Sequence, residues 1–331
     1  MSLQISKDET AIYDRQIRVW GFEAQARMKN SSILVLGTSG LSIELMKNMV
    51  LAGVGQIIVV DERSVELGEL GSNFYINFSD QGKMRAEVCV EKLKLLNPKV
   101  SMLAKTSFTP ELLEGQHLVC HADATLDEMV KILVKVINFQ LENESNLSFQ
   151  RHQIYFRKYI WHVGISFFDL VAHKCKVAET IDETCYVSLS QSFKTTFAKG
   201  TKKQLLRKLS PTFILNKVIL DFCNAEKCRP SQSPEDLAML KNMLEKVVLD
   251  FFPVNEKLQK EVLASFNSAI PFYNIIPLAQ GELAPCTAII GGIMAQEALK
   301  IVSAKDKPIN NIFVYNGLDG EGLVHQLAPE E

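Results

Sequence analysis

The stretch SSILVLGTSGLSIELMKNMVLAGVGQIIVVD, residues 31–61, decides the fold class. A short apolar run ends at Gly37, a segment with helical periodicity follows, and a second apolar run ends at Asp61. Strand, glycine turn, helix, strand and acidic residue form the first βαβ unit of a doubly wound sheet. The sequence therefore predicts an α/β, Rossmann-like fold.

Segments on either side of this unit supply further predicted elements. Helical spacing is found at 14–30, 82–96, 125–140 and 286–303, and strand-like apolar runs at 99–106, 117–122 and 310–317. From 152 to 174 the chain is aromatic and extended, which suits antiparallel strands on one side of the sheet. We take 310–317 as the final strand.

A change in composition divides the chain into three parts. Residues 175–265 contain the basic run KGTKKQLLRK, the polar break EKCRPSQSPED and helical segments. We therefore predict that they form an inserted, mainly helical subdomain. Residues 1–174 would form the N-terminal part of the main domain, and 266–331 would complete it.

Composition argues against several functions. With 47% hydrophobic and 22% charged residues and a net charge of −2, the 331 residues have no field that would attract nucleic acid or an anionic membrane. There is no apolar run of about 18 residues and no apolar signal core near the first residues. Seven cysteines lie scattered without a C-x-x-C pair, which predicts reduced thiols in the nucleus or cytoplasm and no metal site.

The turn between the first strand and helix only partly matches a phosphate-binding loop. A G-x-G-x-x-G motif lets the backbone approach phosphates at the helix N-terminus. Here Gly37 and Gly40 are glycines, but Ser39 and Ser42 stand at the second and last motif positions. The turn is either a working phosphate loop or an ordinary βα turn, and the serines favour the second. Asp61 stands where an acid binds a ribose hydroxyl, or where it caps the next turn.

The segment YDRQIRVWG, residues 13–21, places two arginines ahead of the first strand. Arg15 and Arg18 are three residues apart, so they share one face of a helix. Taken alone, they are solvated surface charges with Asp14 or Glu23 as partners. The neighbouring aromatic residues are expected to pin the helix in place; they are Tyr13, Trp20 and Phe22.

Four ordered blocks together resemble the ubiquitin-activating enzyme superfamily. The blocks are YDRQIRVWG, the βαβ unit ending at Asp61, GKMRAEVCVEKLKLLNP at 82–98 and ELAPCTAIIGGIMAQEALK at 282–300. The match covers roughly 11–125 and 275–320 and is weak across the insertion. Within the superfamily, the length and layout are similar to the small regulatory subunits of heterodimeric SUMO-activating enzymes. The resemblance implies an adenylation-type main domain.

Departures from the active pattern imply a degenerate nucleotide pocket. Where active members carry Asn-Arg-Gln-Phe, this chain has Gly71-Ser72-Asn73-Phe74, so the arginine is absent. The position of the magnesium-binding aspartate falls on Ala124, with Asp123 one residue early. Lys83 and Arg85 lie near the family's basic phosphate ligands. We expect them instead to form salt bridges on a helix, for example with Glu87. The pocket residues carried over are Gly37, Gly40, Asp61 and Lys83.

The resemblance also implies partners and a role in trans. In two-fold dimers of the superfamily, the arginine of the RQI signature reaches the distal phosphates of the ATP in the other half. That residue here is Arg15, and Arg18 either assists it or ties the helix to its own domain. A catalytic large subunit of a SUMO-activating enzyme would hold ATP and Mg²⁺, and this chain would bind no cofactor. A SUMO-type modifier and a conjugating enzyme would join through the complex.

Two features of the last block have alternative interpretations. Cys286 follows proline at a helix start, where a thiol pKa is lowered, but a buried structural cysteine is the commoner case. Gly291 and Gly292 lie inside the helix and predict close backbone packing, either at a dimer interface or within this chain.

Other functions remain open from the sequence. One is a self-sufficient homodimeric adenylating enzyme, and another is a regulatory subunit for a different ubiquitin-like modifier. A third is an NAD-dependent oxidoreductase built on the same βαβ unit, and a fourth is a noncatalytic scaffold. The serines of the turn and the absence of a Tyr-x-x-x-Lys pair disfavour the oxidoreductase.

Overall fold

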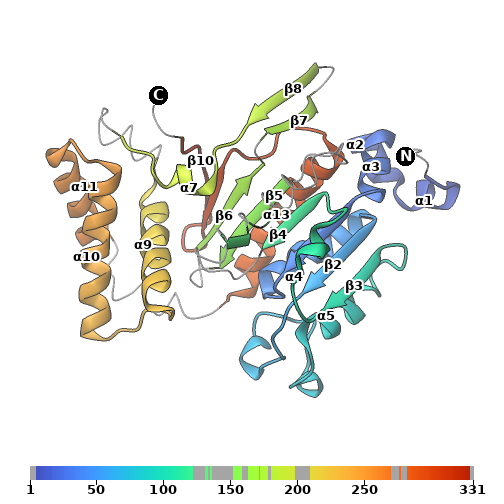
Figure 1. Cartoon of the computed structure of the whole chain (residues 1–331), viewed down its shortest axis with the longest axis horizontal. Coiled ribbons are helices and arrows are strands. Elements are labelled where there is room, and N and C mark those ends of the chain that lie inside the picture. The colour runs from blue at the N-terminus through green and yellow to red at the C-terminus, as the bar shows by residue number, and fades with distance from the viewer. Residues whose placement is uncertain are drawn as a thin grey trace.

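The computed structural model describes residues 5–121, 131–132, 135, 152–158, 163–170, 172–177, 180–197, 209–269, 276 and 282–328. Their centre is an eight-stranded sheet in the order β10-β9-β6-β5-β4-β1-β2-β3 (Figure 1). The strands are β1 (Ser32–Leu36), β2 (Gln56–Val60), β3 (Ser101–Lys105), β4 (Leu118–His121), β5 (His152–Lys158), β6 (Val163–Asp169), β9 (Ile312–Asn316) and β10 (Glu321–His325).

The sheet is parallel in one half and antiparallel in the other. Strands β3, β2, β1, β4 and β5 run parallel, whereas β6, β9 and β10 each pair antiparallel with their neighbours. The α/β, Rossmann-like prediction is confirmed. The antiparallel half begins at β6, one strand later than the aromatic pattern indicated. The prediction that 310–317 is the final strand is wrong, because β10 follows it.

Some helices come before the sheet in the chain, and others pack on it. The N-terminal helices are α1 (Lys7–Ile12), α2 (Asp14–Trp20) and α3 (Phe22–Lys29); those on the sheet are α4 (Gly40–Ala52), α5 (Arg85–Leu93) and α13 (Ala284–Ser303). Short 3-10 turns span η1 (Leu67–Glu69), η2 (Phe78–Asp80) and η3 (Pro110–Leu113). The single helix predicted at 14–30 is two helices, because Gly21 has a φ of +91°. The helix predicted at 125–140 falls largely outside the described residues.

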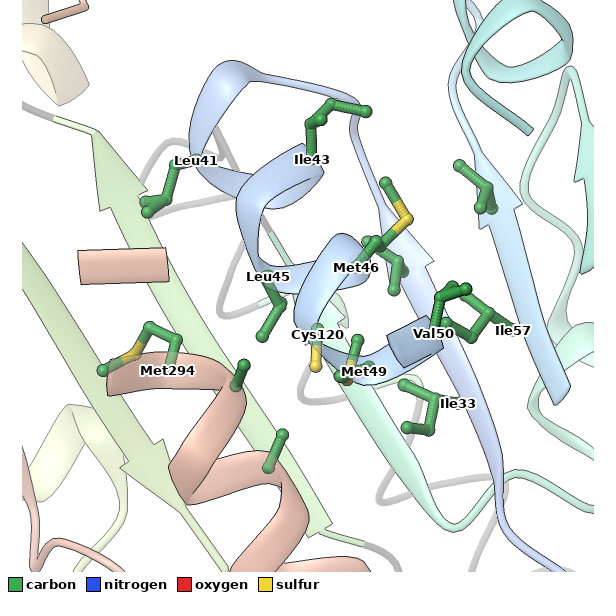
Figure 2. Close-up of a cluster of buried hydrophobic side chains, with 14 of the residues drawn as sticks. Ile33, Leu41, Ile43, Leu45, Met46, Met49, Val50, Ile57, Cys120 and Met294 are labelled. Atoms are coloured by element: carbon green, nitrogen blue, oxygen red, sulfur yellow. The ribbon is translucent and has the colours of Figure 1, made fainter. Parts of the chain in front are cut away.

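Helices α4 and α13 lie side by side over the main core (Figure 2). A Cβ at Gly291 would lie 2.5 Å from the Cβ of Glu44 on α4, so the backbones can approach only because position 291 is glycine. The sequence left open whether the glycines pack at a dimer interface or within this chain. For Gly291 the close packing is within this chain. A Cβ at Gly292 would instead point into open space, with no neighbouring element of the described chain within 4 Å.

Helix α13 is also long and apolar enough to cross a membrane by length and composition. No other helix in the described ranges meets those criteria. More than half of its apolar window is buried, with Met294, Ala298 and Ile301 in the main core. Burial of this kind is typical of the core helix of an α/β domain.

A second core lies where helices cover the antiparallel half of the sheet. It joins Phe213 and Val248 to Phe167 of β6 and Val314 of β9. The helices here are α7 (Leu189–Ser192), α9 (Pro211–Glu226), α10 (Pro234–Phe251) and α11 (Glu256–Ala269). Before them in the chain, β7 (Ala172–Val177) and β8 (Thr180–Cys185) form a separate two-stranded sheet. Strand β7 crosses the first predicted boundary and α11 the second. The division at 174 and 265 stays a prediction.

Candidate functional site

The turn from β1 to α4 is closed by its own serines. Gly37 takes a φ of +90°, a backbone conformation that favours glycine. Ser39 caps α4 and accepts a hydrogen bond from the Ser42 backbone N–H at 3.3 Å. The Ser42 hydroxyl donates to the Ser39 carbonyl at 3.0 Å. Of the two residues that depart from the glycine motif, Ser39 is therefore the N-cap of α4, and Ser42 bonds back to it from the first turn of the helix.

Asp61 lies at the end of β2 and is 4% exposed. Its Oδ2 accepts from the Thr38 backbone N–H at 2.9 Å and from the Thr38 hydroxyl at 2.7 Å. The guanidinium of Arg63 binds both carboxylate oxygens, at 2.9 and 3.1 Å. Burial alone would raise the pKa of Asp61, but Arg63 and the nearby charge of Arg85 outweigh it and lower the pKa to about 2.

Arg85 is buried beside this carboxylate. Its Nε lies 3.6 Å from Asp61 Oδ2, its Nη1 lies 2.7 Å from Glu69 Oε1, and its Nη2 donates to the Thr38 carbonyl at 2.8 Å. The expected pairing with Glu87 is therefore wrong for Arg85. Its charge is taken up by acids and a carbonyl of its own chain, which explains how a cation remains stable in this position.

Lys83 does not join this cluster. Its Nζ lies 2.9 Å from Asp80 Oδ1, and Lys92 binds the other oxygen of the same carboxylate. A salt bridge is thus present as predicted, but with Asp80 instead of Glu87. The structure separates the predicted pocket residues: Gly37 and Asp61 stay together, whereas Lys83 serves another ion pair.

The N-terminus of α4 is covered by a side chain that the sequence did not single out. Glu282, just before α13, accepts a hydrogen bond from the Gly40 backbone N–H at 3.0 Å, with its other oxygen 3.5 Å from the Leu41 nitrogen. A Cβ at Gly40 would lie 2.7 Å from that carboxylate and 2.6 Å from the Ser72 carbonyl. A helix N-terminus after a glycine turn attracts anions, and here the anion belongs to the same chain.

Other residues from the predicted pocket have structural contacts. Asn73 is buried, its side-chain oxygen accepting from the Tyr75 backbone N–H at 3.1 Å. Phe74 is exposed beneath the ammonium of Lys47, 5.4 Å from the ring centre. Asp123 and Ala124 lie outside the described residues. Burial raises the pKa of the Cys286 thiol, which is opposite to what a nucleophilic cysteine requires.

The two arginines of α2 differ in their surroundings. Arg18 forms an exposed ion pair with Asp14 at 2.9 Å. Arg15 is exposed and makes no ion pair or side-chain hydrogen bond with any residue in the part of the chain that the structure describes. Tyr13 is buried and accepts a hydrogen bond from Asn97 at 2.7 Å, so it pins the helix as expected. Phe22 is 47% exposed and does not.

This mixed sheet, whose parallel half carries the strand–turn–helix unit that ends at Asp61, defines a Rossmann-like domain of the adenylation type. The chain belongs to the ThiF family, whose model matches residues 13–331. The resemblance that the four sequence blocks indicated, to the ubiquitin-activating enzyme superfamily and to SUMO-activating small subunits within it, is confirmed.

Curated relatives match nearly the whole chain. SUMO-activating enzyme subunit 1 of Bos taurus is 28% identical over 354 residues, covering 98% of this chain and 97% of that protein. The Homo sapiens protein of the same name gives the same identity and coverage. DNA damage tolerance protein rad31 of Schizosaccharomyces pombe is 29% identical over 335 residues, covering 98% of each chain.

Solved structures support the fold. PaaA aligns over 99% of this chain and 76% of its own, with a TM-score of 0.57 and 12% identity. MccB of E. coli aligns over 99% of this chain and 74% of its own, with a TM-score of 0.55 and 12% identity. At this identity the likeness concerns architecture alone.

Proposed function

We propose that this chain is the regulatory, pseudo-adenylating subunit of a SUMO-activating heterodimer. Its near full-length similarity to proteins named SUMO-activating enzyme subunit 1 supports a role in activating a ubiquitin-like modifier. The partner, a catalytic large subunit, supplies the sites for ATP, Mg²⁺ and modifier and the nucleophilic cysteine. The heterodimer acts in the nucleus and cytoplasm.

One observation carries the proposal that this half is silent: its own side chains take up the groups a nucleotide would need. Asp61 is engaged by Thr38 and Arg63, and the α4 N-terminus by Glu282. A phosphate at α4 would meet the Glu282 carboxylate as a like charge, and a ribose hydroxyl would compete with Arg63 for Asp61. The residues at this site therefore do not fit ATP.

Arg15 is the residue of this chain that is proposed to act at the nucleotide site of the partner. It lies on a helix held to the domain by Tyr13, yet its guanidinium has no acid from this chain among its described contacts. A guanidinium presents a planar fork of donors that matches phosphate oxygens. Arg15 is proposed to reach the distal phosphates of the ATP held by the partner. Arg18, already paired with Asp14, has a lesser supporting role.

The reaction makes clear why such a cation matters. The C-terminal carboxylate of the modifier attacks the α-phosphate of ATP, an acyl–phosphate bond forms, and pyrophosphate leaves. Negative charge builds on the leaving pyrophosphate, and a guanidinium supplied in trans stabilises that charge. The modifier then passes to the partner's cysteine as a thioester and on to a conjugating enzyme. Cys286 of this chain is 8% exposed and is not proposed as a nucleophile.

The test is ATP–pyrophosphate exchange dependent on a SUMO-type modifier. It is run with this chain alone, the large partner alone, the mixture, and mixtures carrying Arg15→Ala or Arg18→Ala. We expect exchange only in the mixture and a loss of about a hundredfold or more with Arg15→Ala, while the heterodimer stays intact. Arg18→Ala should have a smaller effect. Exchange by this chain alone would instead make it a self-sufficient enzyme with a working phosphate turn.

A further inference from the structure

The start of α2 is fixed to the core by side-chain contacts. The Tyr13 ring packs on Gly53, and its hydroxyl accepts a hydrogen bond from Asn97. One turn into the helix, Gln16 Nε2 donates to the Ala52 carbonyl at 2.9 Å. These contacts hold the first turn of α2 against the end of α4. They do not reach its last turn.

The last turn of α2 is held by a residue nearly 300 positions away. Lys305 Nζ donates to the Trp20 carbonyl at 2.6 Å and to the Val19 carbonyl at 3.1 Å. Gly21 ends the helix with a φ of +91°, so the chain turns away here. A cation at a helix C-terminus also interacts favourably with the helix dipole.

The backbone around Lys305 is itself held in place by hydrogen bonds and by the packing of α13. It follows α13, which ends at Ser303 and packs along α4, and its backbone N–H donates to the Lys300 carbonyl at 3.2 Å. The adjacent Ala304 carbonyl accepts from the Lys176 backbone N–H at 2.9 Å. The ammonium that caps α2 is thus anchored by both α13 and β7.

We infer that Lys305 is a positioning residue for Arg15, an inference that rests on the trans role proposed above. A helix of seven residues is marginal in water and depends on its tertiary contacts. Arg15 has no ion pair of its own in the described part of the chain, so its direction follows the axis of α2. Lys305 fixes one end of that axis and Tyr13 the other.

The experiment is a double-mutant cycle in the assembled heterodimer. Modifier-dependent ATP–pyrophosphate exchange is measured for Arg15→Ala, Lys305→Met and the double variant. Lys305→Met keeps the apolar stem and removes the donors. Lys305→Arg restores a cation with donors, and Lys307→Met is the matched control, because Lys307 pairs with Asp182 on β8.

Lys305→Met is expected to lower kcat/KM for ATP about tenfold, the worth of a charge-assisted hydrogen bond. It should have no further effect when Arg15 is already alanine, because the two residues act as one unit. Lys305→Arg should recover most of the loss, and Lys307→Met should change little. Size-exclusion chromatography should show intact heterodimer throughout.

Two results would overturn the inference in different ways. If Lys305→Met lowers exchange equally with and without Arg15, Lys305 stabilises the fold and does not act through Arg15. If Arg15→Ala itself leaves exchange unchanged, the trans role fails, and the positioning role falls with it. The single Arg15 variant therefore separates failure of the proposed function from failure of this inference.

Discussion

The ring of Tyr13 lies against Gly53 so closely that a Cβ at position 53 would come within 2.4 Å of its hydroxyl oxygen. Gly53 ends α4 in the left-handed conformation, with a φ of +79°, and Tyr13 precedes α2. The end of α4, the helix of the first βαβ unit, and the entry to the arginine-bearing helix therefore share one contact. This contact joins α4, which packs on the sheet, to α2, the helix that carries Arg15, the arginine proposed to act in trans.

Gly53→Ala is expected to destabilise the chain by about 2–4 kcal/mol. The left-handed backbone disfavours alanine, and the new methyl group would displace Tyr13. The free energy of unfolding in urea measures this change. Gly68→Ala is the matched control, because no atom of the described residues lies within 4 Å of a Cβ at that position, and we expect at most about 0.5 kcal/mol of change. Equal effects at both positions would contradict the packing of Tyr13 on Gly53.

The adjacent glycines of α13 should respond differently to alanine. At Gly291 the new Cβ would collide with Glu44 on α4, so we expect a loss of about 1–3 kcal/mol. At Gly292 the described part of the chain leaves open space for a Cβ, and alanine should leave the isolated chain unchanged or stabilise it by up to about 1 kcal/mol. The free energy of unfolding in urea is measured for both variants. A loss of stability for Gly292→Ala as large as that for Gly291→Ala would contradict this packing.

Asp61 should make stability sensitive to acid. Its pKa falls from 3.8 to about 2 on folding, so its stabilising contribution is present above about pH 4. That contribution is lost as the pH drops through about 2, and it amounts to about 2 kcal/mol. The measurement compares the free energy of unfolding of the natural chain and Asp61→Asn from pH 6 to 2. The difference between them should shrink in acid; a constant difference would exclude the depressed pKa.

Removing the carboxylate at the α4 N-terminus should open that position to anions. Glu282→Ala takes away a like charge and leaves the Gly40 N–H without this acceptor. We expect the affinity for pyrophosphate or ATP, measured by calorimetry, to rise about tenfold or more. Glu62→Ala, an exposed acid one residue beyond Asp61, controls for net charge. Equal gains in the two variants would mean that Glu282 does not exclude phosphates.

Local patterns predicted most of the fold. The βαβ unit follows from apolar runs separated by a glycine turn, and α13 from unbroken helical spacing near the end of the chain. Predictions failed where local signals were weak. Strand β10 was missed because most of its five residues are exposed and its apolar pattern is short. The break at Gly21 was missed because the amphipathic spacing continues across it.

The candidate site was predictable only in part. The position of Asp61 follows from the length of the unit, but its partners do not. Arg63 stands two residues further on, which is a usable local signal. No local sequence pattern indicates that the guanidinium of Arg85 turns toward Asp61 and Glu69. The predicted pairing with Glu87 fits the spacing of Lys83, four residues earlier, but not that of Arg85, because residues two positions apart on a helix do not face each other.

The chain alone was enough to establish a Rossmann-like domain, its βαβ unit and a family resemblance, because these depend on periodicity and on residues close in sequence. Tertiary structure decided which groups meet at the turn. Glu282 reaches the Gly40 backbone across 242 positions, and Lys305 reaches the end of α2 across 285. Contacts at such separation depend on how α13 packs on α4 and α3, and on side-chain directions that no local pattern encodes.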